Sequence, residues 1–323
     1  MKKIAFLTSG GDAPGMNAAI RAIVKTCLHY DITPFGIYDG YQGMIEGRGK
    51  EMTYADVDNI IQYGGTILGT ARSVDFKTEE GRKHAYEFLN QNQIDGLIVI
   101  GGDGTFTGAT ILSQENNIPI IGLPGTIDND IYGTEYTIGF DTALNTVIDA
   151  VDKIRDTASS HHRIFFVEVM GRDAGFIALH TALASGADSV LIPETITDIP
   201  KLVEEIKNHN KGRRSTIIIV AEGDDEGNAL DILTKVKPHL EGYDLRHSVL
   251  GHIQRGGSPS ALDRKIATRM GSYAVELLIQ NKTGLTIGVK GEELTTCQIS
   301  EAIKEHGTPD LAYLKLIELL RTK

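Results

Sequence analysis

Short apolar runs alternate with amphipathic helical patterns along almost the whole chain, and this alternation restricts the possible folds more than any other feature. The first run, Ile4–Leu7, leads into a helical pattern from about Met16 to Leu28, where apolar residues recur every three or four positions. Further strands are expected at residues 33–38, 94–100, 118–123, 164–169, 189–192, 216–221, 248–250 and 286–289. Further helices are expected at residues 78–90, 142–159, 200–209 and 263–280. A chain with this rhythm buries parallel sheets between layers of helices.

Two stretches of the chain resemble each other, because each reads as strand, glycine turn, Asp-Ala, glycine and helix. They are residues 4–15 and 164–175. A length of 323 residues suits two domains or one large one. Two similar lobes that face one cleft would explain the repeat, although any two strand-turn-helix units look alike and that alternative stays open. No low-complexity linker separates the halves, so the domain boundary is expected in a tight crossing near Gly139–Asp141, with the chain returning later.

Composition excludes several classes of protein. The formal charge of -11 argues against sequence-independent binding of nucleic acids, which needs a basic surface. Cys27 and Cys297 form no CxxC pair and lack metal-ligand spacing, which indicates a reducing compartment and two buried apolar thiols. The first apolar stretch is only a strand long and no run reaches membrane-spanning length. We therefore expect a soluble, cytoplasmic protein with no nucleic-acid or membrane partner.

Two consecutive strands are expected to end in glycine-rich loops that carry acidic residues. These loops are Gly101–Thr105 (GGDGT) and Pro124–Asp130 (PGTIDND). Glycines let the backbone approach a phosphate closely, and a carboxylate can hold a divalent cation. Such strand ends line one crevice of an open α/β sheet, so the sequence favours a phosphoryl-transfer site. Asp128 and Asp130 also suit turn formation or helix capping, and this structural alternative stays open.

A third glycine turn, Gly10–Asp12, follows the first expected strand and opens onto a helix N-terminus, which attracts anions. Two better-known nucleotide signatures are absent from the sequence, because no GxxxxGK[ST] occurs and no GxGxxG opens a helix after a strand. The P-loop and dinucleotide-binding interpretations are thereby weakened.

Several arginines stand in small, glycine-rich contexts. They are Arg72, Arg163, Arg172, Arg246 and Arg255. Each alone is typical of a solvated surface charge. Together they suit recognition of a phosphorylated substrate by forked guanidinium contacts. His252 stands three residues before Arg255 and beside glycines, so we expect a phosphate ligand there rather than a core histidine.

Five motifs along the chain carry a family resemblance. They are residues 10–17 (GGDAPGMN), 101–104 (GGDG), 124–130 (PGTIDND), 170–172 (MGR) and 251–257 (GHIQRGG). In their order and spacing they resemble bacterial ATP-dependent 6-phosphofructokinases of the phosphofructokinase A family, over essentially the whole chain. The resemblance implies an α/β protein of two Rossmann-like three-layer lobes with mainly parallel sheets and an active site in the cleft between them. It also implies a large ATP-binding lobe of residues 1–140 plus about 254–303, and a smaller sugar-phosphate-binding lobe of about 141–253 plus 304–323.

The activity that the resemblance implies is the committed step of glycolysis, in which ATP and D-fructose 6-phosphate give ADP and D-fructose 1,6-bisphosphate. Transfer is in line to the 1-hydroxyl, with Asp128 as the base. Mg²⁺ is the implied cofactor, held by Asp103 with help from Asp130 through the water shell of the metal. The residues implied at the transferring phosphoryl group are Arg72, Gly11, Thr126 and Arg172.

The resemblance also assigns the binding residues. Those for ATP are Gly11, Tyr41, Arg72, Ser73, Gly102, Asp103, Gly104, Thr105 and Gly108. Those for the sugar phosphate are Thr126, Ile127, Asp128, Arg163, Met170, Gly171, Arg172, Glu222, Arg246, His252, Ile253, Gln254 and Arg255. In the family Arg163 and Arg246 reach this substrate from a neighbouring subunit, so a homotetramer with active sites shared across an interface is implied.

An effector pocket for ADP or phosphoenolpyruvate is implied as well. Its residues are Arg21, Ala22, Ile23, Val24, Lys25, Arg155, Gly186, Ala187, Asp188, Lys211, Arg213, Arg214 and Ser215. This chain departs from the family pattern there, with Lys25 in place of the usual Arg, Asp188 in place of Glu, and Asn59 where relatives can have Asp. Lysine lacks the guanidinium fork and Asp is one methylene shorter than Glu, so we expect weak allosteric control.

Three alternative functions remain. Pyrophosphate-dependent relatives typically carry an Asp at the position of Gly104 and a Lys at that of Gly125, so two glycines favour ATP. NAD and lipid kinases share the GGDG motif but not the other motifs. A nucleotide-sensing binding protein without catalysis would be expected to lack Asp103 or Asp128, and both are present.

Overall fold

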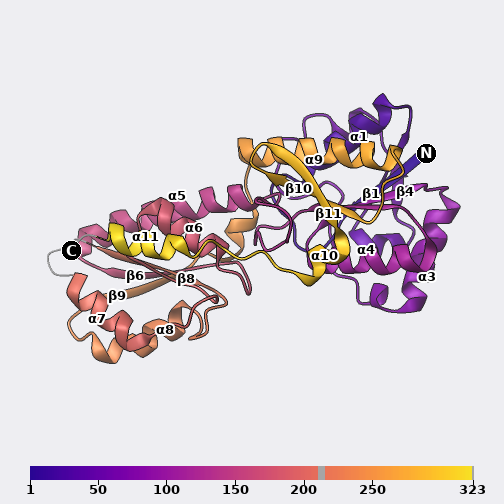
Figure 1. The fold of residues 1–323 in the computed structure, drawn as a ribbon. Helices are drawn as coiled ribbons and strands as arrows, with labels where there is room; N and C mark the ends of the chain where they lie inside the picture. The colour runs from indigo at the N-terminus through magenta and orange to yellow at the C-terminus, as the bar shows by residue number, and fades with distance from the viewer. Residues whose placement is uncertain (210–214, 322–323) are drawn as a thin grey trace. The chain divides into compact units, whose positions relative to one another are not determined.

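The computed structural model describes residues 1–209 and 215–321. They form two compact units (Figure 1). The first unit comprises residues 1–127, 131–142 and 255–307. The second comprises residues 128–130, the described part of 143–254, and 308–321. Within the described ranges no helix is both long and apolar enough to cross a membrane.

The first unit is built on a seven-stranded sheet in the order β11-β10-β5-β4-β1-β2-β3. Its strands are β1 (Lys3–Thr8), β2 (Thr33–Ile37), β3 (Gly49–Glu51), β4 (Gly96–Gly101), β5 (Ile120–Pro124), β10 (Leu285–Lys290) and β11 (Glu293–Gln298). The five central strands pair in parallel, and only the edge strands β3 and β11 are antiparallel to their neighbours. The prediction of a mainly parallel α/β architecture is confirmed.

The strand order reverses between β1 and β4. The chain passes from β1 to β2 on one side, and β4 and β5 lie on the other side of β1. In open α/β sheets ligands bind outside the carboxyl ends of the strands at such a reversal. The glycine turn at Gly10 and the GGDG loop at Gly101 follow these two strands, so the fold brings both to the reversal point.

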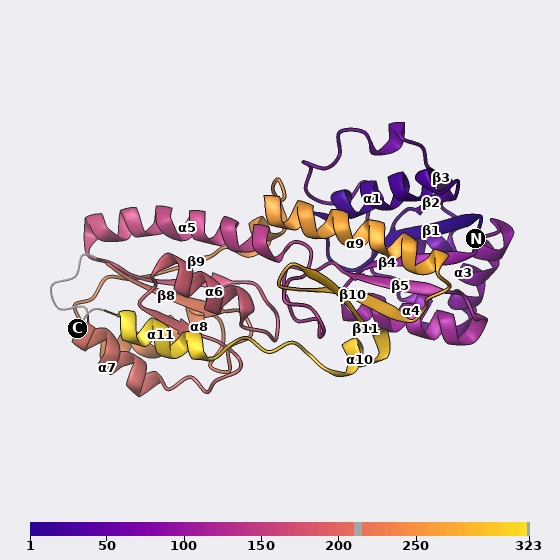
Figure 2. The same cartoon turned by 45° about the horizontal axis from the view of Figure 1, so that its top comes forward.

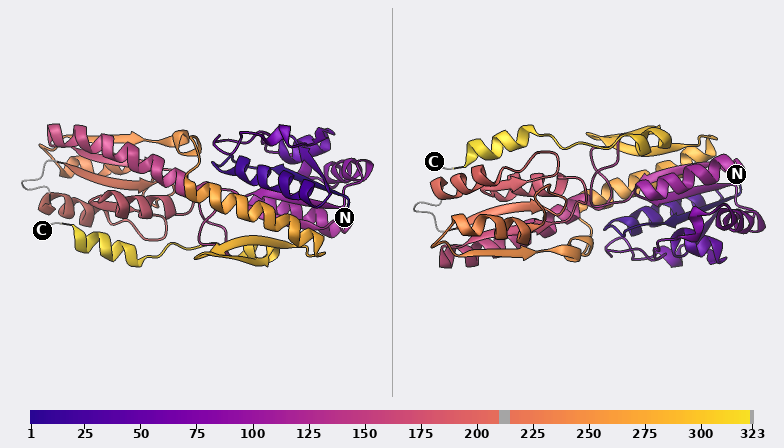
Figure 3. Two further views of the ribbon diagram at one scale, coloured as in Figure 1. Left: turned by 90° about the horizontal axis from the view of Figure 1, so that it is seen from above. Right: turned by 90° about the horizontal axis from the view of Figure 1, so that it is seen from below.

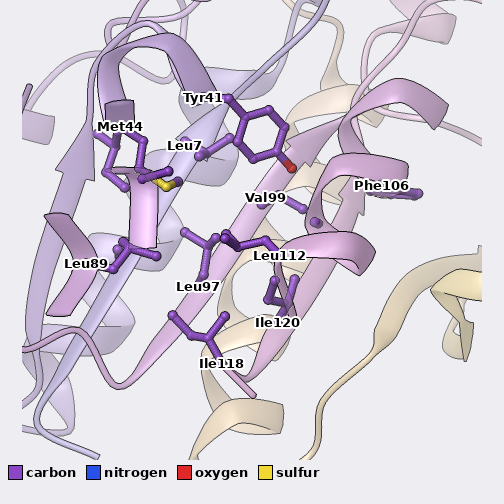
Figure 4. Close-up of a cluster of buried hydrophobic side chains, with 14 of the residues drawn as sticks. Leu7, Tyr41, Met44, Leu89, Leu97, Val99, Phe106, Leu112, Ile118 and Ile120 are labelled. Carbon is purple, nitrogen blue, oxygen red and sulfur yellow. The ribbon is translucent and has the colours of Figure 1, made fainter. Parts of the chain in front are cut away.

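Helices cover both faces of this sheet (Figures 1 and 2). On one face α1 (Met16–His29) and α9 (Ala261–Ile279) pack side by side, and on the other lie α3 (Glu79–Gln91) and α4 (Asp103–Asn116), with α10 (Ile299–Lys304) against α4. Figure 4 shows the core beneath α3 and α4, where Leu97 and Val99 of β4 meet Leu89 and Leu112 of the helices. Tyr41, from the short helix α2 (Gly40–Ile45), belongs to the same buried cluster.

The second unit contains a four-stranded parallel sheet in the order β7-β8-β6-β9. Its strands are β6 (Ile164–Val169), β7 (Ser189–Leu191), β8 (Thr216–Ala221) and β9 (Leu245–Val249). Its helices are α5 (Phe140–His161), α6 (Phe176–Ser185), α7 (Ile199–His209), α8 (Ala229–Val236) and α11 (Ala312–Leu320), and α5 begins at the end of the first unit. Helices α7 and α8 pack on one face of the sheet, and α6, with α11 against it, covers the other (Figures 1 and 3).

Side-chain caps mark the N-termini of helices α3 and α8. Thr78 accepts a hydrogen bond from the Gly81 N–H at 3.0 Å and begins α3. Asn228 and Asp231 form a reciprocal capping box at the start of α8. Such caps satisfy backbone donors that the helix itself leaves unpaired.

The strand expected at residues 248–250 lies instead at Leu245–Val249. This strand is at the edge of its sheet and pairs only with β6, and most of its side chains are partly or fully exposed. A partly exposed edge strand needs no apolar run, so apolar patterning located it poorly. The edge strands β3 and β11 are polar for the same reason and were not expected from the sequence.

Candidate active site

The two glycine turns at the strand reversal are held together by two hydrogen bonds. The Ser9 N–H donates to the Ile100 carbonyl at 3.0 Å, and the Thr105 hydroxyl donates to the Ser9 carbonyl at 3.0 Å. A Cβ on Gly101 would lie 2.4 Å from the Ser9 carbonyl oxygen, closer than real contacts allow. Glycine at this position is therefore a requirement of the packing between the two strand ends.

The guanidinium of Arg255 lies over the first of these turns. A Cβ on Gly11 would stand 2.5 Å from Arg255 Nη1, and this nitrogen is 3.4 Å from the Asp12 carbonyl oxygen. The family resemblance assigns Arg255 to the sugar phosphate, and the structure places its side chain against the glycine turn after β1. A cation over a glycine turn suits an anionic ligand.

Asp103 is the first residue of α4, and Gly102 precedes it as the cap residue. Its side chain is 31% exposed, and Nδ1 of His306 lies 3.4 Å from its Oδ2. Among the described residues no group of three or more His, Cys, Asp or Glu side chains is arranged to hold a metal ion. Phosphoryl-transfer sites usually bind Mg²⁺ through one or two carboxylates together with substrate phosphates and water. A single accessible carboxylate beside a helix N-terminus fits that chemistry.

Four residues predicted for the nucleotide, Tyr41, Ser73, Thr105 and Gly108, pack around Phe76. Tyr41 stacks on Phe76 with ring centroids 4.0 Å apart, and its hydroxyl donates to the Thr105 carbonyl at 2.5 Å. Burial raises the pKa of Tyr41 above its ordinary value. A Cβ on Gly108 would lie 3.0 Å from the Phe76 ring. The Ser73 hydroxyl accepts from the Phe76 N–H at 3.1 Å, so these side chains shape the segment around Phe76 and support Thr105.

The loop that carries Arg72 is fastened to the end of β1, while Arg72 itself is exposed. The Thr70 hydroxyl donates to the Gly10 carbonyl at 2.8 Å, and Thr8 donates to the Gly69 carbonyl at 2.8 Å. The buried Asn17 amide accepts from the Ile67 N–H at 2.8 Å. Sequence reasoning assigned no role to Asn17, because its partners lie in a distant loop.

Asp128 is 2% exposed. Arg172 Nε lies 3.5 Å from its Oδ2, and the Arg172 side chain itself is 55% exposed. The neighbouring Asn129 adopts a left-handed conformation with φ 58°. In the first unit, the Thr137 hydroxyl fixes this loop by donating to the Thr126 carbonyl at 2.7 Å. A buried carboxylate beside an accessible guanidinium suits proton transfer next to a phosphoryl group.

Two residues predicted as sugar-phosphate ligands hold the turn that presents Arg172. Glu222 Oε1 accepts from the Arg172 N–H at 2.8 Å and from the Gly171 N–H at 3.3 Å. The fully buried Gln254 accepts from the Met170 N–H at 3.2 Å and donates to the Gly251 carbonyl at 3.0 Å. Gly171 and Arg172 have φ values of 144° and 53°, so these contacts stabilise a left-handed turn.

The remaining sugar-phosphate candidates are partly or fully exposed, apart from Ile127. His252 and Ile253 are exposed on the short 3-10 helix η4 (Gly251–Arg255). Arg163 and Arg246 both form ion pairs with Asp244. Ile127 is fully buried, so its side chain belongs to the core of the first unit.

The predicted effector residues fall into three groups. Arg155, Gly186, Ala187, Asp188 and Ser215 line one cavity of about 290 Å³ in the second unit. Arg21–Lys25 lie on α1 of the first unit, where Ala22, Ile23 and Val24 are buried. Lys211, Arg213 and Arg214 lie outside the described residues.

Inside that cavity two charged side chains contact backbone groups. Arg155 donates to the Ser185 carbonyl at 2.8 Å and to the Gly186 carbonyl at 3.2 Å. Asp188 Oδ2 accepts from the Ile217 N–H at 2.8 Å. Arg321 of the C-terminal segment also lines this cavity, and no pattern in the sequence indicates that contribution.

Comparison with known proteins identifies the family. The model of the Phosphofructokinase family matches residues 3–278. The chain is 53% identical over 305 residues to ATP-dependent 6-phosphofructokinase 2 of Bacteroides thetaiotaomicron, covering 94% of each chain. It is 51% identical over 322 residues to ATP-dependent 6-phosphofructokinase 1 of Thermus thermophilus, covering 99% of each.

A solved structure agrees with the sequence comparison. Phosphofructokinase from Saccharomyces cerevisiae superposes with a TM-score of 0.89 at 38% identity over 100% of this chain. This chain spans 48% of the length of that yeast chain. The fold, the strand-end glycine loops and the sequence identity together define a kinase architecture of the phosphofructokinase type. The chain belongs to the phosphofructokinase family.

Proposed function

We propose that the protein transfers the γ-phosphoryl group of ATP to the 1-hydroxyl of D-fructose 6-phosphate, forming ADP and D-fructose 1,6-bisphosphate. Identity above 50% over nearly the full length to two bacterial enzymes named for this reaction supports the proposal. The structural observation that carries it is the buried carboxylate of Asp128, 3.5 Å from the exposed guanidinium of Arg172. Phosphoryl transfer to an alcohol needs such a proton acceptor beside fixed positive charge.

In this proposal Asp128 accepts the proton of the attacking hydroxyl. Arg172, Arg72 and the Thr126 hydroxyl stabilise the charge that develops on the transferring phosphoryl group. Glu222 and Gln254 fix the turn of Arg172 through the backbone contacts described above. Pre-oriented donors of this kind favour the transition state because they need no reorganisation during the reaction.

The nucleotide is proposed to bind at the strand reversal of the first unit. Gly11 in the turn after β1, and Gly102, Gly104 and Thr105 at the N-terminus of α4, would surround its phosphates with backbone N–H groups. The enzyme works with a divalent metal, as is typical of the family, and we propose Mg²⁺ held by Asp103, which when bound shields phosphate charge. Tyr41 acts here by supporting the Thr105 carbonyl.

The sugar phosphate is proposed to contact His252 and Arg255 together with the backbone around Met170. Arg163 and Arg246 are proposed to serve the site of a neighbouring subunit in a homotetramer. ADP or phosphoenolpyruvate is proposed to bind the cavity at Arg155 with weak allosteric effect. The Asp188 carboxylate accepts a hydrogen bond from the Ile217 N–H. This contact supports weak coupling between the effector cavity and the active site, because it ties the carboxylate to the backbone.

Purified protein with fructose 6-phosphate, assayed separately with ATP and with pyrophosphate, tests the proposal. We expect turnover with ATP and none with pyrophosphate. Turnover only with pyrophosphate would overturn the donor assignment. Turnover with neither would favour a nucleotide-sensing protein without catalysis.

A further inference from the structure

Two arginines that the proposed function gives to the sugar phosphate share one carboxylate. Arg163 Nε lies 2.7 Å from Asp244 Oδ2, and Arg246 Nη2 lies 2.9 Å from Asp244 Oδ1. Arg163 therefore donates a hydrogen bond to one oxygen of Asp244, and Arg246 forms an ion pair with the other. The side chains of Arg163, Asp244 and Arg246 are 25%, 37% and 51% exposed, so the group lies at the surface of the second unit.

The sheet places these three residues together. Arg163 directly precedes β6, Asp244 directly precedes β9, and the Ile164 N–H donates to the Asp244 carbonyl at 3.1 Å. The parallel register then sets Phe165 opposite Arg246. The sheet thus fixes the backbone positions of the three residues, and the Asp244 carboxylate fixes the positions of the two guanidinium groups.

We propose that Asp244 is a positioning residue that assembles Arg163 and Arg246 into one recognition unit for the phosphate of the sugar substrate. This inference rests on the proposed function, which assigns the two arginines to that phosphate. Two neighbouring guanidinium groups repel each other, and each has many rotamers. One carboxylate that contacts both lowers the repulsion and restricts the rotamers. The unit keeps a net charge of one positive, which still attracts a phosphate dianion.

The hydrogen bonding leaves donors for the substrate. Arg163 donates to Asp244 from Nε, so this contact uses neither of its Nη groups. Arg246 uses Nη2 for Asp244, and Nη1 donates to the Leu245 carbonyl at 3.2 Å. The hydrogen bond from Arg163 and the charges of both arginines and His161 hold the pKa of Asp244 below its ordinary value, so the carboxylate is ionised at neutral pH.

The Asp244 carboxylate also repels the phosphate of the substrate. This repulsion opposes the gain from positioning the two arginines. Asp244 is more than one third exposed, so solvent and salt screen that repulsion strongly. The orientation of the two arginines is less sensitive to screening, because it arises from one short hydrogen bond and one close ion pair. We therefore expect positioning to outweigh repulsion.

Steady-state kinetics of Asp244→Asn and Asp244→Glu test the inference on the full-length assembled enzyme. Asp244→Asn is expected to raise KM for fructose 6-phosphate about tenfold, with kcat and KM for ATP within about twofold of wild type. Asp244→Glu is expected to recover most of the loss, since it restores a carboxylate. Glu241→Gln removes an acidic charge three residues away and serves as the matched control, with KM expected to be unchanged.

The two single arginine variants separate this inference from the proposed function. If Arg163→Ala and Arg246→Ala leave KM for fructose 6-phosphate unchanged, the proposed role of the arginines fails. If they raise KM while Asp244→Asn leaves it unchanged or lowers it, the inference about Asp244 alone is overturned. Adding Asp244→Asn to Arg163→Ala should cost little more than Arg163→Ala itself, and additive effects would contradict a shared unit. Loss of subunit association in Asp244→Asn would also overturn it, since the carboxylate would then act on assembly.

Discussion

Replacement of Gly104 by aspartate tests where the nucleotide phosphates bind. Gly104 is the second residue of α4, directly after Asp103. A Cβ built on Gly104 meets no atom within 4 Å, so a side chain fits there without displacing its neighbours. An acidic residue in the first turn of a helix is also favourable for the helix itself. Gly104→Asp should therefore fold with unchanged or slightly raised stability.

The expected loss is electrostatic. A new carboxylate ~6 Å from a nucleotide phosphate, at an effective dielectric constant of ~20, repels one unit of its charge by about 3 kcal/mol. At about 1.4 kcal/mol per factor of ten, KM for ATP should rise roughly a hundredfold. KM for fructose 6-phosphate should change little, because the perturbation lies at the proposed nucleotide site.

Initial rates at saturating fructose 6-phosphate measure this effect, with thermal unfolding as the check on folding. Gly104→Asn is the matched control, since it adds the same shape without charge, and Gly104→Ala adds only the Cβ. We expect both controls to keep KM for ATP within a few-fold of wild type. An equal KM for the Asp and Asn variants would refute the electrostatic reasoning. If Gly104→Ala raises KM for ATP as much as Gly104→Asp does, the ligand or the backbone needs the space beside Gly104.

Four further predictions address the other residues. Asp128→Asn should lower kcat about a hundredfold or more with little change in KM for fructose 6-phosphate, and near-normal turnover would remove Asp128 as the base. Asp103→Asn should raise the Mg²⁺ concentration needed for half-maximal rate, because an amide is a poorer ligand for a hard cation; an unchanged Mg²⁺ titration would place the metal elsewhere. Mixed tetramers of Arg246→Ala and Asp128→Asn subunits should regain activity, and verified mixtures without any gain would indicate self-contained sites. Phosphoenolpyruvate and ADP should shift the fructose 6-phosphate saturation curve only slightly, and a large shift abolished by Arg155→Ala would contradict weak control.

Local sequence predicted most of the central elements. Strands β6 and β8 have the expected bounds, Ile164–Val169 and Thr216–Ala221, because both are almost fully buried and consist mostly of apolar residues. The edge strand β9 was misplaced because most of its side chains are partly or fully exposed. A strand that is buried on both faces must be apolar, so its composition reveals it. The position of an edge strand depends mainly on its pairing with the neighbouring strand.

The candidate site shows the same division. The glycine turns and acidic loops were predicted from contiguous residues, because a strand end that approaches a phosphate needs glycine at fixed local positions. The sequence could not assign Gln254 to the Met170 backbone or Glu222 to the Arg172 backbone, partners that are 84 and 50 positions apart. From the sequence alone, both side chains are equally compatible with a role as substrate ligands and with a role in holding the backbone.

Contiguous residues were enough to establish the alternation of strands and helices, the strand-end loops and the family. The long-range partners that hold these loops emerge only from the three-dimensional fold, as with Arg255, which lies over Gly11 and reaches Asp12 from 243 positions away. The physical reason is that secondary structure and glycine turns follow from each residue and its near neighbours. Side-chain contacts between distant segments depend on sheet order and register, which no local pattern encodes.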